Sequence, residues 1–205
     1  THCISSAASD VYKRQLLDNF TLISLASAVE PLRMANQLSG KELYRWHTLT
    51  LDGQPVCASD GLKITPDAST ANAPALSAVI VCGGVDIQRS VTRDHVQWLQ
   101  GQARQGRQMG AVCTGSWALA KAGLLDGYDC SVHWEFLAAM QEAFPRAAIT
   151  TRLFSIDRNR NTSSGGTAPM DMMLHLIGRE HGRELAAAIS EMFIYERIRL
   201  SLIHI

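Results

Sequence analysis

Short apolar runs and helical stripes alternate along the chain. Residues 78–82 (AVIVC) form an apolar run typical of a strand buried on both faces, residues 108–113 are predicted to form the next strand, and residues 44–51 have strand composition. Helical patterns are predicted between them, at residues 27–38, 92–103, 116–122, 135–144 and 167–181 and after Gly182. Alternating strands and helices indicate an α/β fold with a mainly parallel sheet.

Capping residues predict where several helices begin and end. Ser27 and Glu30 fit a capping box, with Pro31 in the first turn, so a helix is expected to start at Ser27 and to end at Gly40. Thr92 and Thr167 are predicted to cap two later helices. Residues 131–134 are predicted to form a strand that carries His133.

The two ends of the chain differ from the rest. Residues 1–15 show neither helical nor strand periodicity, and residues 200–205 (LSLIHI) form a sudden apolar run after a charged helix. We expect both to be foreign read-through at the edges of a gene fragment, with a native disordered arm and a helix end as the alternative. The folded domain is then residues 16–199, with Leu16 and Leu17 as the remnant of a first strand.

Length, composition and charge exclude several classes of protein. The 205 residues are 46% hydrophobic and 19% charged, which is typical of one globular domain, and their apolar stretches are too short to span a membrane. Lys and Arg together number 19, as do Asp and Glu, so the chain lacks the basic surplus of a DNA-binding surface.

Cysteine and histidine usage indicates a cytoplasmic chain without a metal site. The five cysteines form no CxxC pair, which favours a reducing compartment, and no signal peptide is visible. His175 and His181 are six residues apart, which places them on different helix faces. We therefore expect neither a metal nor a cofactor.

One constellation carries the chemistry. Residues 111–115 (AVCTG) place Cys113 at a tight turn from strand to helix, flanked by small residues, as in a nucleophile elbow. The helix start is expected to favour the thiolate of Cys113 and to bind anions. Gly83 and Gly84 end a neighbouring strand and offer backbone N–H groups to the same place. A buried structural cysteine is the alternative interpretation.

Several motifs, each weak alone, occur in the order found in one family. The chain resembles the DJ-1/PfpI-like (class I glutamine amidotransferase-like) sensory domain of GlxA-type regulators in the AraC family, and is most similar to those that control glycine betaine, carnitine and arginine catabolism. The resemblance rests on residues 28–33 (AVEPLR), 35–36 (AN), 81–84 (VCGG), 113–115 (CTG), 122–127 (AGLLDG), 133–135 (HWE), 165–168 (GGTA) with Asp171, and 195–199 (YERIR).

The resemblance implies a flavodoxin-like three-layer α/β/α sandwich that binds a small effector near the elbow. It also implies a homodimer, and two helix-turn-helix motifs that follow residues 195–199 in the full-length family. DNA would be contacted only through that second domain, which this chain lacks.

The resemblance also bears on catalysis. Enzymes of the wider superfamily pair the elbow cysteine with an acidic residue, and that position falls on Ser24, while Thr114 stands where hydrolases have histidine. Cys113 then has only His133 as a base, and both are expected to be vestigial. The alternatives are a stand-alone cysteine hydratase or hydrolase, and a redox or chaperone-like protein in which peroxide oxidises Cys113.

A betaine ligand would need two kinds of contact. Its carboxylate is expected on backbone N–H groups of residues 114–115 and 83–84, and its quaternary ammonium on the aromatic faces of Trp117 and Trp134. Helix-on-sheet packing is the alternative role for both tryptophans. Arginine as effector would instead require acidic residues such as Glu30, Glu135 or Asp171.

Overall fold

A central seven-stranded sheet organises the protein. The computed structural model describes residues 10–17, 19–74 and 77–195. The strands lie in the order β10 (Phe154–Asp157), β11 (Arg160–Ser163), β7 (Gln108–Val112), β6 (Ala78–Cys82), β1 (Asp10–Leu16), β2 (Tyr44–Thr50) and β5 (Ala68–Ser69). Neighbouring strands are parallel except β10 and β11, which pair antiparallel.

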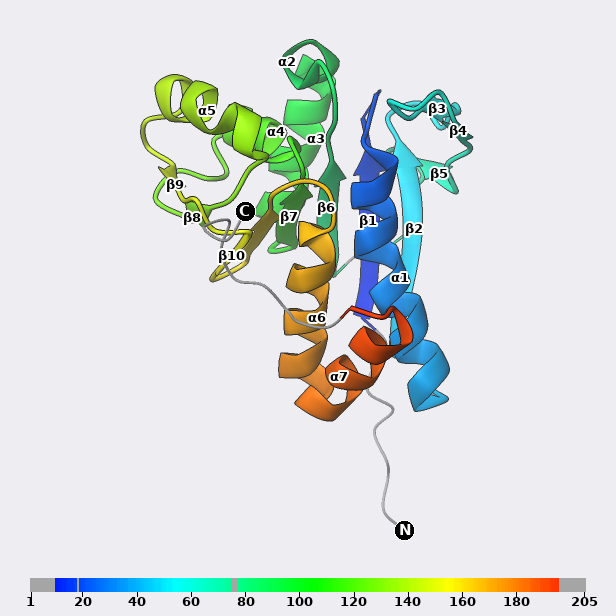
Figure 1. Cartoon of the computed structure of the whole chain (residues 1–205). Helices are drawn as coiled ribbons and strands as arrows, with labels where there is room; N and C mark the ends of the chain where they lie inside the picture. Colours follow the sequence, from blue (N-terminus) through cyan, green and yellow to red (C-terminus); the bar gives the residue numbers. More distant parts are fainter. Residues whose placement is uncertain (1–9, 18, 75–76, 196–205) are drawn as a thin grey trace.

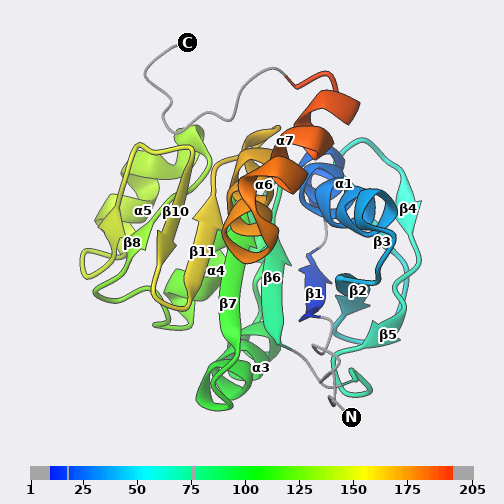
Figure 2. The same cartoon turned by 90° about the horizontal axis from the view of Figure 1, so that it is seen from below.

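Helices cover both faces of this sheet and make a three-layer α/β/α sandwich. One face carries α1 (Leu22–Ser39), α6 (Ala168–His181) and α7 (Arg183–Met192), and α3 lies on the opposite side (Figures 1 and 2). The second helical layer comprises α3 (Arg93–Arg104), α4 (Ser116–Lys121), α5 (Leu137–Ala143) and the short α2 (Ile87–Ser90). The flavodoxin-like fold predicted from the sequence is confirmed.

Strand β6 shows why its sequence is apolar throughout. All five of its side chains are buried, and they alternate between the two hydrophobic cores. Ala78, Ile80 and Cys82 belong to the core beneath α1 and α6, while Val79 and Val81 belong to the core beneath α3 and α4. Because side chains of a strand point alternately to opposite faces, a strand covered by helices on both sides favours apolar residues at every position.

Smaller elements lie at the edges of the sheet. Strands β3 (Val56–Cys57) and β4 (Lys63–Ile64) pair antiparallel, and β8 (Asp129–Cys130) pairs parallel with β9 (Ala148–Ile149). A 3₁₀-helix, η1 (Trp134–Phe136), leads into α5. Within the described residues, no helix combines the length and the hydropathy needed to cross a membrane.

The first strand is longer than the sequence predicted. β1 runs from Asp10, pairing Asp10 with Tyr44 of β2 and Leu16 with Cys82 of β6. The prediction that the fold begins at Leu16 is therefore wrong for residues 10–15. A central parallel strand is held by backbone hydrogen bonds to both neighbours, and these need no periodicity of side chains. Whether these residues are foreign to the natural protein stays a prediction, and residues 1–9 and 196–205 lie outside the described part.

Helix α1 also begins earlier than predicted. Its N-cap is Thr21, and Ser27 is a buried position inside the helix, so the expected capping box at Ser27 is wrong. Pro31 lies within the helix, where it removes one backbone donor, and the contacts of α1 with the core outweigh that loss. The predicted end at Gly40 is confirmed by its left-handed φ of 66°.

The cap of α3 makes the stability of the fold depend on pH. The N–H of Thr92 donates to Nδ1 of His95 at 3.2 Å, and burial lowers the pKa of His95 to about 4. The unfolded chain, with a histidine pKa of about 6.5, therefore binds more protons than the folded chain between these values. The contribution of His95 to the free energy of unfolding is therefore fully present above the unfolded pKa and is lost as the pH falls toward 4.

We expect acidification from pH 7 to 4.5 to cost the wild-type protein about 1–2 kcal/mol more than the His95→Gln variant. Glutamine at this position keeps the capping interaction but has no titrating proton. Urea unfolding of both proteins at the two pH values measures the difference. Equal losses of unfolding free energy in the two proteins would contradict a lowered pKa of His95.

Candidate functional site

The turn after β7 forces Cys113 into a strained backbone conformation. Its φ is 60°, and its side chain is only 4% exposed. The neighbouring glycines show the cause, because a Cβ on Gly115 would lie 2.2 Å from the carbonyl oxygen of Val81, and one on Gly83 would lie 2.3 Å from the amide nitrogen of Gly115. The predicted elbow with its small flanking residues is confirmed. It lies at the carboxyl ends of β6 and β7.

Side chains from α1 surround the thiol of Cys113. The hydroxyl of Thr21 lies 3.5 Å from Sγ, and the hydroxyl of the completely buried Ser24 faces the carbonyl of Gly166 at 3.5 Å. Burial raises the pKa of Cys113, and the polar groups of Thr21, Thr114 and Ser24 only partly offset that effect. The expectation that the helix start favours a thiolate is therefore wrong. Desolvation disfavours the charged form more than these donors stabilise it.

His133 reaches the same place from a loop. Its N–H donates to the carbonyl oxygen of Cys113 at 3.0 Å, and it caps η1. The predicted strand over residues 131–134 is wrong, since β8 ends at Cys130. Here the chain leaves its pairing with β9 and turns toward the elbow.

Burial also sets the protonation of His133. It lowers the pKa of the imidazole, and Glu135 only partly opposes it. Because Nδ1 accepts from the N–H of Glu135 at 3.4 Å, the neutral ring carries its proton on Nε2. A Cβ on Gly165 would lie 3.0 Å from that Nε2 and 3.2 Å from the Cys113 sulfur, so both groups border the same point.

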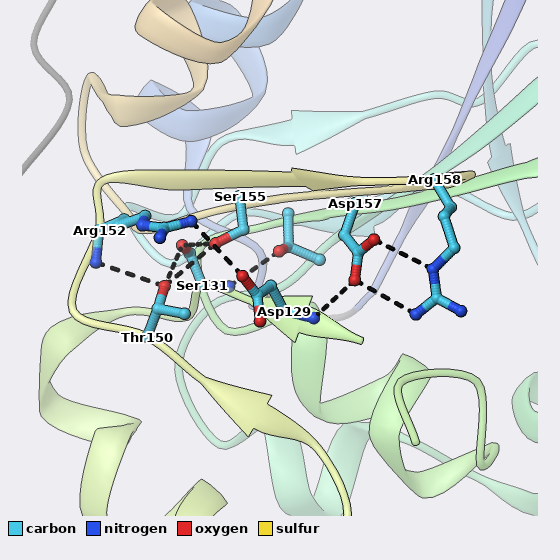
Figure 3. Close-up of polar contacts among 8 residues, drawn as sticks. Asp129, Ser131, Thr150, Arg152, Ser155, Asp157 and Arg158 are labelled. Atoms are coloured by element: carbon cyan, nitrogen blue, oxygen red, sulfur yellow. Dashed lines mark hydrogen bonds and ion pairs between the residues drawn. The ribbon is translucent and has the colours of Figure 1, made fainter. Parts of the chain in front are cut away.

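A buried network of hydroxyl groups fastens the loop that carries His133 (Figure 3). The N–H of Ser131 donates to the Thr162 hydroxyl at 2.8 Å, and its own hydroxyl lies 2.8 Å from that of Ser155 and 3.3 Å from that of Thr150. The Ser131 carbonyl accepts from Ser116 of α4 at 2.7 Å. Satisfied buried networks of this kind are rigid, so they fix where His133 lies.

Charged groups continue this network toward the surface. The N–H of Asp129 donates to the carboxylate of Asp157 at 2.9 Å, and Asp157 pairs with Arg158 at 3.0 Å (Figure 3). Arg152 reaches Asp129 at 3.5 Å. The contacts of Asp129 with Asp157 and with Arg152 join residues 28 and 23 positions apart, so no local sequence pattern predicts them.

Two of the backbone donors predicted to bind an anion are used within the protein. The N–H groups of Gly83 and Gly115 both donate to the carbonyl of Val112, at 3.3 and 3.0 Å. The Thr114 hydroxyl donates to the carbonyl of Gly84 at 2.8 Å. The glycines are required because the backbones approach closely. The prediction that the N–H groups of Gly83 and Gly115 bind an anion is therefore wrong, since both already donate to Val112.

The two predicted tryptophans have different surroundings. Trp117 is 9% exposed and packs edge-on against Phe144 and Phe136 at 4.9 and 6.3 Å between ring centroids. It therefore has the contacts of a core residue, in keeping with the structural alternative. Trp134 is 59% exposed, and its ring lies 5.7 Å from the ring of His133. A ligand role for Trp134 stays a prediction.

A cavity of about 730 Å³ lies away from the elbow, against α6 and α7. No local sequence pattern predicts this cavity, because it arises only from the packing of two helices on each other. It is lined by Leu174, His175, Gly178, Arg179, Arg183, Ala186, Ala187, Ser190, Glu191, Ile194 and Tyr195. Within the described part of the chain, no three His, Cys, Asp or Glu side chains gather so as to hold a metal ion.

The fold and the elbow agree with a family comparison. The model of the DJ-1/PfpI family matches residues 19–179, which contain the elbow, His133 and Gly165. The chain belongs to the DJ-1/PfpI family. It is 86% identical over 184 residues to the HTH-type transcriptional regulator GbdR of Pseudomonas aeruginosa, covering 90% of this chain and 50% of that protein.

Two further relatives are also regulators by name. The HTH-type transcriptional regulator CdhR of Pseudomonas aeruginosa is 45% identical over 90% of this chain and 54% of its own length. The crystal structure of an AraC family transcriptional regulator from Pseudomonas putida superposes with a TM-score of 0.82 at 31% identity, covering 90% of this chain and 99% of that one. This DJ-1/PfpI chain spans about half the length of the curated relatives, and its resemblance to regulators of the AraC family is confirmed.

Close packing at the elbow predicts opposite effects for two glycine substitutions. Gly115→Ala is expected to destabilise the protein by about 3 kcal/mol or more, because the new Cβ meets the Val81 carbonyl. Gly101→Ala in α3 meets nothing within 4 Å and is expected to stabilise by about 0.5–1 kcal/mol. Urea unfolding measures both. Similar effects from the two substitutions would contradict the packing argument.

The raised pKa of Cys113 predicts slow alkylation at neutral pH. The midpoint of the rate of reaction with iodoacetamide, followed by mass spectrometry of the Cys113 peptide, is expected above the ordinary thiol value of about 8.5. Thr21→Val removes a hydrogen bond that stabilises the thiolate and is expected to move the midpoint higher still. Thr70→Val, which removes only a bond to the Leu51 carbonyl, is the control. A midpoint below 8 would refute a buried, neutral thiol.

Proposed function

We propose that this chain is the effector-sensing domain of a transcriptional regulator and binds a small amino-acid-like or quaternary-amine metabolite of the glycine betaine type beside Cys113. The observation that carries the regulatory role is the 86% identity to GbdR over 90% of the chain. A net charge of 0 agrees with DNA contacts made by another part of a longer protein. As a regulator it acts in the cytoplasm, as a homodimer.

The protonation of the elbow supports binding rather than turnover. A thiolate–imidazolium pair needs a thiol more acidic than the imidazolium, but burial raises the pKa of Cys113 and lowers that of His133. The hydroxyl of Ser24, where superfamily enzymes carry an acid, cannot serve as a base near pH 7. A cysteine-dependent hydratase or hydrolase is therefore the second candidate.

The same neutral groups suit a carboxylate. The Sγ–H of Cys113, the Nε2–H of His133 and the hydroxyl of Thr21 are all donors, and Thr21 lies 3.5 Å from the sulfur. Neutral donors bind a carboxylate by hydrogen bonds without a fixed charge of their own. We therefore assign the carboxylate of the effector to this inner end of the site.

The outer end of the site suits a cation. Trp134 is 59% exposed beside His133, and the Glu135 carboxylate lies 3.7 Å from Nδ1 of the same histidine. A quaternary ammonium donates no hydrogen bond, so it is held by an aromatic face, about 0.5–2 kcal/mol, and by a nearby negative charge. A zwitterion thus finds donors inside and an aromatic ring with a carboxylate outside.

We expect glycine betaine to bind the wild-type chain in isothermal titration calorimetry, and Trp134→Ala to weaken that binding about tenfold. Cys113→Ala removes one neutral donor of three and is expected to change the affinity less than about fivefold. Ala187→Trp, which fills the separate α6–α7 cavity from an exposed position, is the control and is expected to leave binding unchanged.

The outcomes of this experiment separate the candidates. Weakening by Ala187→Trp but not by Trp134→Ala would move the effector to the α6–α7 cavity. Absence of binding to the wild-type chain would refute the betaine assignment. Turnover of a nitrile or amide substrate that disappears in Cys113→Ala would favour the enzyme.

A further inference from the structure

The last described residue is fastened to the start of another helix. The phenol of Tyr195 donates to Oδ2 of Asp171 at 2.8 Å, and Asp171 is completely buried in the first turn of α6. The N–H of Tyr195 donates to the carbonyl of Ser190 at 2.9 Å, and the Ser190 hydroxyl donates to the carbonyl of Tyr195. Tyr195 is therefore held at its side chain and at both backbone groups.

Strain accompanies this attachment. Ile194 has a φ of 53°, although it is β-branched, and its side chain is 90% exposed. Branched residues rarely adopt this conformation, and they keep it only where their surroundings impose it. The exposed side chain of Ile194 supplies no such constraint, so the bonds of Tyr195 hold the turn. Release of Tyr195 would let the backbone at Ile194 relax.

The same first turn of α6 begins at the elbow. Gly165 borders both Cys113 and His133, and its carbonyl accepts from the N–H of Ala168, the first residue of α6. The Gly166 carbonyl faces the hydroxyl of Ser24 at 3.5 Å. Because Gly165 has no free space toward His133 and the sulfur, a change in the position of either group is passed to the start of the helix.

We propose that the Tyr195–Asp171 hydrogen bond is a latch through which occupancy of the elbow controls the conformation of the chain at residues 194–195. A ligand or adduct beside Cys113 displaces residues 165–166 and the first turn of α6, and so alters the distance between Asp171 and Tyr195. This proposal names the regulation of the proposed effector site and rests on it. The two sites are then coupled, and such coupling is reciprocal.

Hydrogen exchange with mass spectrometry tests the latch with two probes of the elbow. The first is carbamidomethylation of Cys113 in a Cys3→Ser, Cys57→Ser background, which fills the site whatever the natural effector is. The second is glycine betaine. Each probe is expected to change amide exchange at residues 165–171 and, about threefold or more, at residues 190–195. Tyr195→Phe is expected to keep the first change and lose the second.

Tyr44→Phe is the matched control. The Tyr44 phenol donates to Glu180 at 2.6 Å, near the far end of the same helix, so this variant loses a similar bond away from both the elbow and Tyr195. Both variants are expected to lower the melting temperature, and only Tyr195→Phe to uncouple residues 190–195. A purely structural role would leave the probe-dependent exchange intact in both.

The two probes distinguish a failure of the latch from a failure of the proposed function. If alkylation of the wild-type chain leaves residues 190–195 unchanged, or if Tyr44→Phe uncouples them equally, the latch is overturned. If alkylation produces the expected pattern and glycine betaine does not, the latch stands and the betaine assignment fails.

Discussion

The close approach of β6 to the turn after β7 is the constraint on which the site depends. Gly115 lies against the Val81 carbonyl and Gly83 lies against the Gly115 amide, so the chain can pass only with small residues there. The same turn imposes the left-handed φ of Cys113 and leaves its carbonyl to receive the N–H of His133. Thiol, imidazole and the glycine loop before α6 therefore meet at one point because three backbones are packed together.

Burial at this point decides what the site can do chemically. A thiol near a helix start is often a reactive thiolate, but desolvation has the larger effect here, and Cys113 keeps its proton while His133 stays neutral. Neutral donors beside an exposed tryptophan are suited to hold a zwitterion and are poorly suited to attack a substrate. The proposed sensing role therefore rests on the protonation of the elbow as well as on its geometry.

Helix α6 connects this chemistry to the rest of the chain. Its first turn follows Gly165 and Gly166 at the elbow and carries Asp171, the partner of Tyr195. A helix moves as a stiff body, so a small displacement of the residues before α6 also displaces the side chains of its first turn. The strained Ile194 beside Tyr195 adds a local conformation that can relax, which is a property expected of a switch and not of a simple connector.

The sequence by itself determined those features that short-range pattern controls. Strand β6, the elbow at Cys113, the end of α1 at Gly40, the cap at Thr92 and the start of α6 after Thr167 were all predictable, because periodicity and capping act within one element. Tertiary structure alone decided the start of β1 at Asp10, the loop that carries His133, and the separation of Trp117 in the core from Trp134 at the surface. It also decided the contact of Thr21 with Cys113 across 92 residues. These features depend on which segments meet in space. Contacts between residues far apart in the sequence produce no local periodicity from which they could be predicted.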